Sequence, residues 1–129
     1  MISSSPEMRL RYCKAVNDYN ITMKQIESGK FDQALLSFQE LIEIYKEFEN
    51  DFLISNCYFS IGNVLNNNKL HEGALLNFRK ALEIFREIHG ENHARTCDCY
   101  EGIGHVLSEQ GRYDDAFIGY GKALAIRMV

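Results

Sequence analysis

Residues 99–124 read CYEGIGHVLSEQGRYDDAFIGYGKAL, and residues 57–82 read CYFSIGNVLNNNKLHEGALLNFRKAL. The two segments share aromatic, glycine, alanine and leucine positions at a constant offset of 42 residues, as for Tyr58 and Tyr100. Self-similarity at a fixed period of this length indicates a repeat array. Such arrays serve as interaction platforms more often than as catalysts, so the repeat predicts the kind of task without naming a partner.

Small residues and helical spacing indicate that each copy is a pair of packed helices. Gly62 and Ala74 are separated by 12 residues, as are Gly104 and Ala116. A residue with little or no side chain on each arm lets the two helices approach closely. In the region before these copies, apolar residues recur at steps of three and four, which is the spacing of an amphipathic helix. They are Phe31, Ala34, Leu35, Phe38, Leu41, Ile42, Tyr45 and Phe48.

A first, looser copy precedes the other two. Residues 29–34 (GKFDQA) match residues 111–116 (GRYDDA) in type, but Thr22 stands 12 residues before Ala34, where the other copies have glycine. The first helix also carries its own apolar run, which predicts a register shifted by about one position. The run comprises Tyr12, Val16, Tyr19, Met23 and Ile26.

The pattern aromatic-x-x-Ile/Leu-Gly, Gly-Lys/Arg-aromatic-Asp-x-Ala and Phe/Tyr-x-x-Ala-Leu resembles the tetratricopeptide repeat (TPR). The period of 42 residues and the linker 89–96 (HGENHART) resemble the longer variety of kinesin light chains. The resemblance covers roughly residues 12–128. It implies an all-α fold, a right-handed superhelix of three TPR hairpins (an α-solenoid). We expect a single domain, residues 1–129, with hairpins at about 7–48, 52–88 and 93–128. Thr22, His71 and Ala94 depart from the pattern, which affects details of the first hairpin and the loops.

Composition narrows the classes of function. The chain has 129 residues, of which 46% are hydrophobic, and this suits a single soluble domain whose hairpins share one core. No apolar run approaches the roughly 20 residues of a membrane span, and residues 1–6 (MISSSP) lack the features of a signal peptide. The net charge of -4 argues against a nucleic-acid partner. We expect a cytoplasmic protein with no membrane association.

Cysteine and histidine residues give no sign of catalysis. Cys57 and Cys99 precede equivalent aromatic residues and are expected to be free thiols that pack in the core. The Cys97-x-Cys99 pair lacks a matching Cys or His pair at zinc-finger spacing. His89 and His93 lie in the linker, where the resemblance to kinesin light chains implies that His93 organises the turn. We therefore predict no catalytic residues, no metal and no cofactor.

The first helices of successive TPR hairpins line a concave groove. If Gly62 and Gly104 face their hairpin partners, the neighbouring residues face this groove. The candidate groove residues are Asn56, Phe59, Asn63, Asn66, Asp98, Glu101, His105 and Glu109. Residues 55–68 contain no charged side chain, so the groove is predicted to be amide-rich and to turn acidic in the third copy. Gly102 is expected on the same face, where alanine would be tolerated.

The asparagine cluster allows two interpretations. Asparagine is a poor helix former and costs up to roughly half a kcal/mol relative to alanine. A carboxamide both donates and accepts, so it can hold the backbone of an extended peptide, as the resemblance implies for Asn63. Alternatively, the asparagines end the helix and form the turn. We favour the turn for Asn67 and Asn68, and the groove for Asn63 and Asn56.

The sequence thus predicts a noncatalytic protein–protein interaction module. It would be a TPR adaptor or scaffold that binds an extended, neutral to basic peptide segment of a partner protein. The second and third copies lack the Lys and Arg residues with which related TPR domains clamp acidic chaperone tails. Two alternatives stay open: a structural or self-associating segment of a larger TPR protein, and a regulatory domain of an enzyme that is not in this chain.

The last hairpin suggests a site of self-association. TPR arrays usually finish with an additional helix that shields the final hairpin, and none is encoded after it here. The resulting candidates for an exposed apolar patch are Phe117, Tyr120, Leu124 and Ile126. Either the chain is a fragment of a longer array, or the patch pairs with a second copy to give a homodimer with two-fold symmetry.

Overall fold

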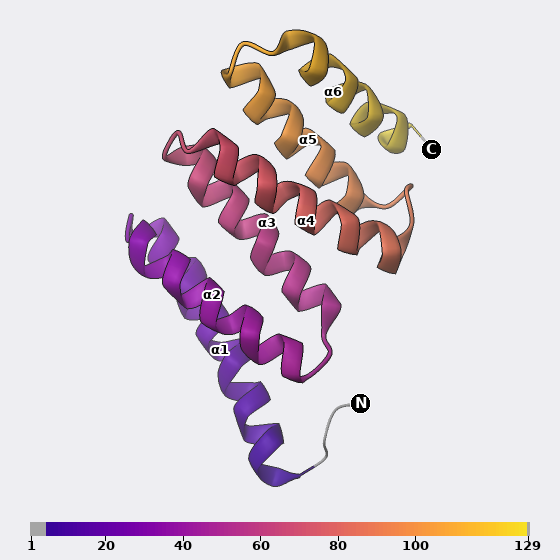
Figure 1. Cartoon of the computed structure of the whole chain (residues 1–129). Helices are drawn as coiled ribbons and strands as arrows, with labels where there is room; N and C mark the ends of the chain where they lie inside the picture. Colours follow the sequence, from indigo (N-terminus) through magenta and orange to yellow (C-terminus); the bar gives the residue numbers. More distant parts are fainter. Residues whose placement is uncertain (1–4, 129) are drawn as a thin grey trace. The chain divides into compact units, whose positions relative to one another are not determined.

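The computed structural model describes residues 5–128, which form six α-helices joined by short turns (Figure 1). The helices are α1 (Pro6–Glu27), α2 (Phe31–Glu47), α3 (Asp51–Asn67), α4 (His71–His89), α5 (Ala94–Glu109) and α6 (Tyr113–Arg127). These residues include no strand, so the predicted all-α class is confirmed. None of the described helices is both long and apolar enough to cross a membrane.

Each hairpin turn contains one residue in the left-handed conformation. Gly29 (φ 77°) and Gly111 (φ 78°) take this role in the first and third hairpins, and Lys69 (φ 64°) takes it in the second. The residue after the turn then bonds back to the helix, as Arg112 N donates to Leu107 O over 2.9 Å. Glycine adopts this conformation without a Cβ penalty, so the second turn is the more strained one.

The described residues form two compact units, 5–57 and 58–128. In the first unit, α1 packs against α2 around Tyr45, which is fully buried. Its hydroxyl donates to Ala15 O over 3.1 Å, and Asn50 Nδ2 donates to Tyr12 Oη over 2.7 Å. The buried side chains of α2 and its end are Ala34, Phe38, Leu41, Ile42, Tyr45 and Phe48.

The predicted register shift of α1 is wrong. Ala15 and Thr22 are buried, at 1% and 2% exposure, whereas Val16 and Met23 are 36% and 38% exposed. Thr22 therefore occupies the position that glycine holds in the other copies. Its hydroxyl donates to Asp18 O over 2.8 Å, so the buried polar group is satisfied within its own helix.

In the second unit, the aromatic ring of Phe78 on α4 lies between two glycines. A Cβ atom built on Gly62 of α3 would lie 2.8 Å from the ring, and one built on Gly102 of α5 would lie 2.9 Å from it. A Cβ on Gly104 would likewise lie 3.2 Å from the ring of Tyr120 on α6. The small residues do permit close packing, but aromatic rings fill the space at Gly62 and Gly104.

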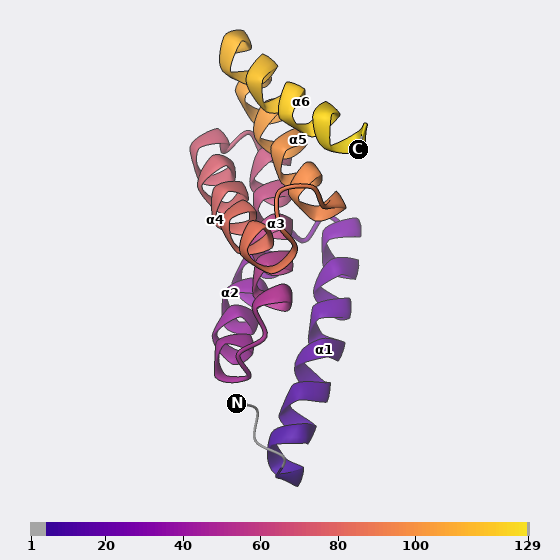
Figure 2. The ribbon, with the colours of Figure 1, turned by 90° about the vertical axis from the view of Figure 1, so that its right-hand side faces the viewer.

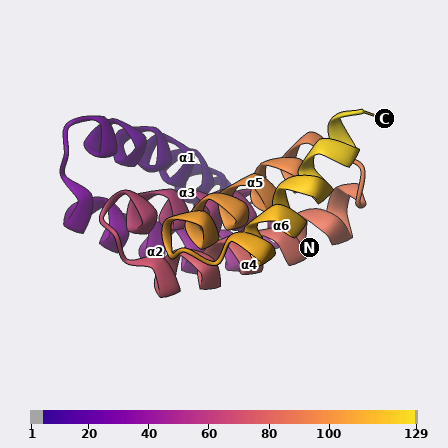
Figure 3. The same ribbon diagram turned by 90° about the horizontal axis from the view of Figure 1, so that it is seen from above.

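In the third hairpin the two backbones themselves approach closely, and α5 and α6 run side by side (Figures 2 and 3). A Cβ on Gly119 of α6 would lie 3.4 Å from Cα of Gly104 and from O of Tyr100. α4 packs against α5 as well. Cys99 is fully buried in this core, as Cys57 is in the first unit, and burial raises the pKa of both thiols to about 12. Their predicted packing role is confirmed.

Replacing Gly102 with alanine tests the glycine–aromatic contact. From the sequence we expected Gly102→Ala to be tolerated, but the added methyl would press on the Phe78 ring, which is 1% exposed. We expect the free energy of unfolding to fall by about 1–3 kcal/mol in urea titrations. Gly121→Ala is the control, since nothing lies within 4 Å of its Cβ position. It should gain up to about 1 kcal/mol of helix propensity. Equal effects of the two changes would contradict the packing.

Candidate functional site

A hollow of about 460 Å³ lies between α3, α5 and α6, within the second compact unit. We refer to it as the α3/α5 hollow. It is lined by Phe59, Asn63, Asp98, Glu101, Gly102, His105 and Tyr120. The structure thus brings together five of the residues expected in the groove. It adds Tyr120, which the sequence had suggested only for the self-association patch.

Helical spacing and core contacts position these side chains. Residues 98, 101, 102 and 105 share one face of α5 because they follow steps of three and four. Phe59 packs on Phe78 with ring centroids 5.4 Å apart and planes at 58°. Tyr120 lies over Gly104, as described above. Both aromatic walls of the hollow are therefore held by contacts with the helices beneath them.

Acidic groups dominate the electrostatics of the hollow. Its lining includes Asp98 and Glu101 but no Lys or Arg side chain. Burial raises the pKa of the half-buried Asp98, an effect that nearby Arg95 opposes. Glu101 forms an ion pair with Arg127 of α6 and accepts a weak hydrogen bond from Cys97 Sγ, 3.5 Å away. Arg127 therefore neutralises one of the two carboxylates, that of Glu101.

Three of the expected groove residues lie elsewhere. Asn66 is only 7% exposed and does not line the hollow, and its Oδ1 is buried without a hydrogen-bond partner in the described part of the chain. Burial therefore prevents it from offering its carboxamide to a ligand. Glu109 also lies outside the lining, and its carboxylate contacts Lys69 Nζ (3.4 Å) and His105 Nε2 (2.6 Å). Asn56 belongs to the first compact unit and is half-buried.

The exposed face of α6 differs from the same face of α4. Exposure is 79% for Phe117, 41% for Tyr120 and 59% for Leu124. The residues 42 positions earlier, Leu75, Phe78 and Leu82, are 2%, 1% and 9% exposed. The reason is that α5 packs on α4, while no helix among residues 5–128 covers this face of α6. Ile126 was expected in the patch but is half-buried against the core.

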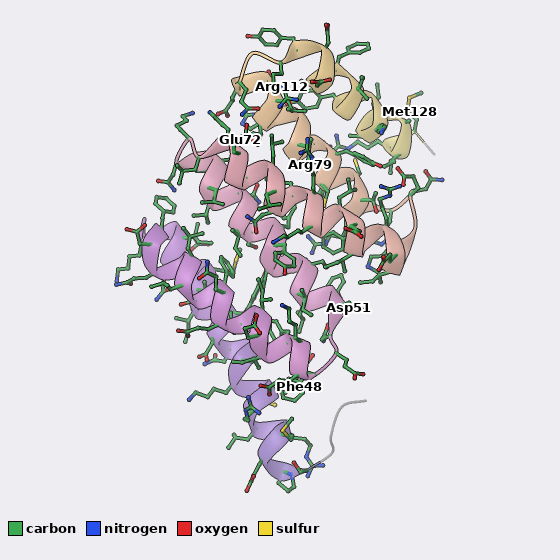
Figure 4. All side chains as sticks on the ribbon, in the orientation of Figure 1. Phe48, Asp51, Glu72, Arg79, Arg112 and Met128 are labelled. Carbon is green, nitrogen blue, oxygen red and sulfur yellow. The ribbon has the colours of Figure 1, made fainter. Side chains whose placement is uncertain are left out.

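A second hollow, of about 860 Å³, was missed by sequence reasoning. It lies between α4, α5 and α6, with Tyr100 and Ile103 of α5 in its lining. Charged residues of both signs accompany them, including Arg79, which projects from α4 (Figure 4). Tyr100 and Ile103 are buried, at 6% and 9% exposure, as the repeat spacing predicts for packing residues. The sequence pattern therefore gave no signal of a hollow beside them. The remaining lining residues are Leu82, Glu83, Arg86, Glu87, Glu91, Asp115, Ile118, Gly119 and Lys122.

The two linker histidines stack on each other. Their ring centroids are 4.0 Å apart and their planes differ by 12°. Nδ1 of His93 accepts a hydrogen bond from the backbone N–H of Arg95 over 3.1 Å and so caps α5. This contact organises the turn, as the resemblance implied. Within the part of the chain that the structure describes, no group of three or more His, Cys, Asp or Glu side chains is placed to hold a metal ion.

Comparison with known proteins defines the class of protein. The Tetratricopeptide repeat family model matches residues 53–128, which is more than half of the chain, so the chain belongs to the TPR family. Its fold is accordingly an α-solenoid of helical hairpins. Comparison with curated protein sequences gives no significant match.

Among solved structures, the crystal structure of BtubC (BKLC) from P. vanneervenii is similar over 99% of this chain, with a TM-score of 0.83 and 19% sequence identity. The alignment covers 49% of the BtubC chain, so this chain spans about half of its length. At this level of identity, the similarity establishes the shared fold.

The stacked histidines predict a dependence of stability on pH. Burial, followed by the proximity of His93 and Arg95, lowers the pKa of His89. The folded state therefore favours neutral His89, and the stability gained from this is present above the ordinary histidine pKa of about 6.5 and is lost as the pH falls below it. In His89→Gln, which cannot gain this charge, we expect a smaller drop in melting temperature between about pH 7.5 and about pH 5.5 than in the wild type. Identical drops would rule out this contribution.

Proposed function

We propose that this chain is a noncatalytic adaptor or scaffold module that binds an extended segment of a partner protein in the α3/α5 hollow. The supporting observation is that one exposed carboxamide, two aromatic rings and two carboxylates line the same hollow. TPR repeats are generally protein–protein interaction modules, which agrees with this use. The four cysteines are free thiols, which suits the reducing cytoplasm in which we place the module.

Asn63 is the residue that we assign to the backbone of the bound segment. It is exposed on α3 and lines the hollow opposite the residues of α5. An extended peptide presents N–H and C=O groups that a helix or sheet would otherwise satisfy, and one carboxamide can both accept from and donate to them. Phe59 and Tyr120 supply apolar contact to the side chains on either side. Together these groups can hold a peptide without requiring a complete sequence motif.

Substitution of Asn63 tests the proposed site. A partner is first captured from the source lysate, and the bound segment is mapped by cross-linking and synthesised. Asn63→Ala should weaken binding of this segment by about 1–3 kcal/mol in isothermal titration calorimetry, because buried backbone hydrogen bonds are lost. Asn67→Ala is the matched control, since Asn67 is exposed at the end of the same helix but does not line the hollow. If both variants bind as the wild type does, the peptide lies elsewhere.

Self-association is a second candidate function, and the exposed face of α6 favours it. Phe117, Tyr120 and Leu124 form an apolar stripe whose counterparts on α4 are buried. Exposed stripes of this kind tend to find a partner, and a second copy of the same chain is the simplest symmetric one. Tyr120 belongs both to this stripe and to the α3/α5 hollow, so dimer formation and peptide binding would compete for it.

A charge placed in the stripe tests self-association. Leu124→Glu should shift the monomer–dimer equilibrium toward monomer in sedimentation velocity runs over a concentration series, because burying the carboxylate in an apolar contact is costly. Leu76→Glu, which adds the same charge at a 54% exposed leucine of α4, should leave the equilibrium unchanged. A wild-type chain that remains monomeric at millimolar concentration would eliminate this candidate.

A further inference from the structure

We infer that the α3/α5 hollow recognises a cationic side chain of the bound segment, specifically the guanidinium of an arginine. This inference rests on the proposed function and deepens it by naming the chemistry of the partner. The juxtaposition that carries it is a pair of carboxylates, Asp98 and Glu101, beside two aromatic rings, with no Lys or Arg side chain in the lining. His105, which also lines the hollow, pairs through Nε2 with Glu109, 2.6 Å away.

The rings of Phe59 and Tyr120 come from different helices and both line the hollow. Phe59 is held by its contact with Phe78, and Tyr120 rests on the bare backbone at Gly104. The face of an aromatic ring attracts a cation, and a planar guanidinium can also stack on it. Rings that are already positioned lose little conformational entropy when a ligand binds.

The carboxylates supply the charge complementarity. Asp98 and Glu101 lie three residues apart on the face of α5 that lines the hollow. Asp98 is half-buried. Burial disfavours the charged form of Asp98 and raises its pKa, and the nearby Arg95 and Arg127 oppose this effect without cancelling it. A guanidinium beside it would remove that cost.

An arginine of the chain itself shows that this face accepts a guanidinium. Arg127, at the end of α6, pairs through Nη2 with Oε1 of Glu101. Arg127 and Asp98 also line a smaller hollow of about 260 Å³ next to the first. The chain therefore neutralises Glu101 internally, and Asp98 is the carboxylate that the guanidinium of the ligand would pair with. Because its charge lies close to Asp98, Arg127 opposes the entry of a second cation.

Other side chains fit the hollow less well. An acidic residue would place a third carboxylate in the same hollow as Asp98 and Glu101, and like charges repel. A neutral residue would leave Asp98 uncompensated while excluding more water from it. Lysine carries the charge but offers no flat group to stack on an aromatic ring or to form two parallel hydrogen bonds. Arginine combines the positive charge, the flat group and the paired donors.

The test uses the full chain and a synthetic probe, a flexible peptide of Gly, Ser and Asn with one central arginine. Its controls replace that arginine with citrulline, which has the same shape without the charge, or with glutamate. Binding is followed by nuclear magnetic resonance through the side-chain amide of Asn63 and the backbone amide of Gly102. We expect these signals to shift with the arginine peptide, at least about tenfold weaker binding of the citrulline peptide, and no shift with the glutamate peptide.

Variants of the protein refine the test. Asp98→Asn should weaken binding of the arginine peptide about tenfold, and Asp114→Asn, which removes the same charge outside the hollow, should leave it unchanged. Arg127→Gln frees Glu101 and should strengthen binding several-fold. Thermal unfolding of each variant verifies that the fold is intact.

Equal binding of the arginine and citrulline peptides, or no shift at the hollow up to the solubility limit of the arginine peptide, would overturn the inference. Unchanged binding in Asp98→Asn would do the same. The proposed function fails separately, when a mapped partner segment binds without regard to Asn63. A partner that needs Asn63 but inserts a neutral residue would sustain the function and reject the arginine.

Discussion

The second compact unit depends on the contact between the ring of Phe78 and two glycines. Because Gly62 and Gly102 lack side chains, one ring of α4 fits against both α3 and α5, at 1% exposure. The same ring supports Phe59, whose own ring forms a wall of the α3/α5 hollow. Core packing and the candidate binding site are thus coupled through a single aromatic side chain. A change that moves this ring alters both stability and the site.

Equivalent aromatic residues of two repeats differ in their exposure to solvent. Phe78 and Tyr120 occupy equivalent positions, 42 residues apart, and each lies over a glycine of the preceding helix. α5 packs on α4 and covers Phe78, whereas Tyr120 stays 41% exposed on α6 and lines the hollow. The Tyr120 side chain is therefore accessible, as both proposed uses require. Burial, rather than residue type, separates the structural aromatic from the candidate binding aromatic.

The sequence predicts the part of the candidate site that lies on one face of a single helix. Helical periodicity places Asp98, Glu101 and His105 together on α5 whatever surrounds them, and the structure has all three in the lining. Periodicity does not reveal what a neighbouring helix contributes, so Tyr120 was assigned only to the patch. For the same reason, Asn66 was expected to reach the groove, although it is 7% exposed and lies outside the lining.

The sequence by itself determined the all-α class, the repeat and the turn positions. These properties are local, since they follow from helical spacing and from small residues at fixed intervals. Tertiary structure alone decided the burial of Thr22, the clamping of Phe78 by Gly102 and the pairing of Arg127 with Glu101. Each of these depends on side chains brought together from different turns or helices. Which side chains meet depends on how the helices pack against one another. The sequence pattern of a single helix does not contain this information.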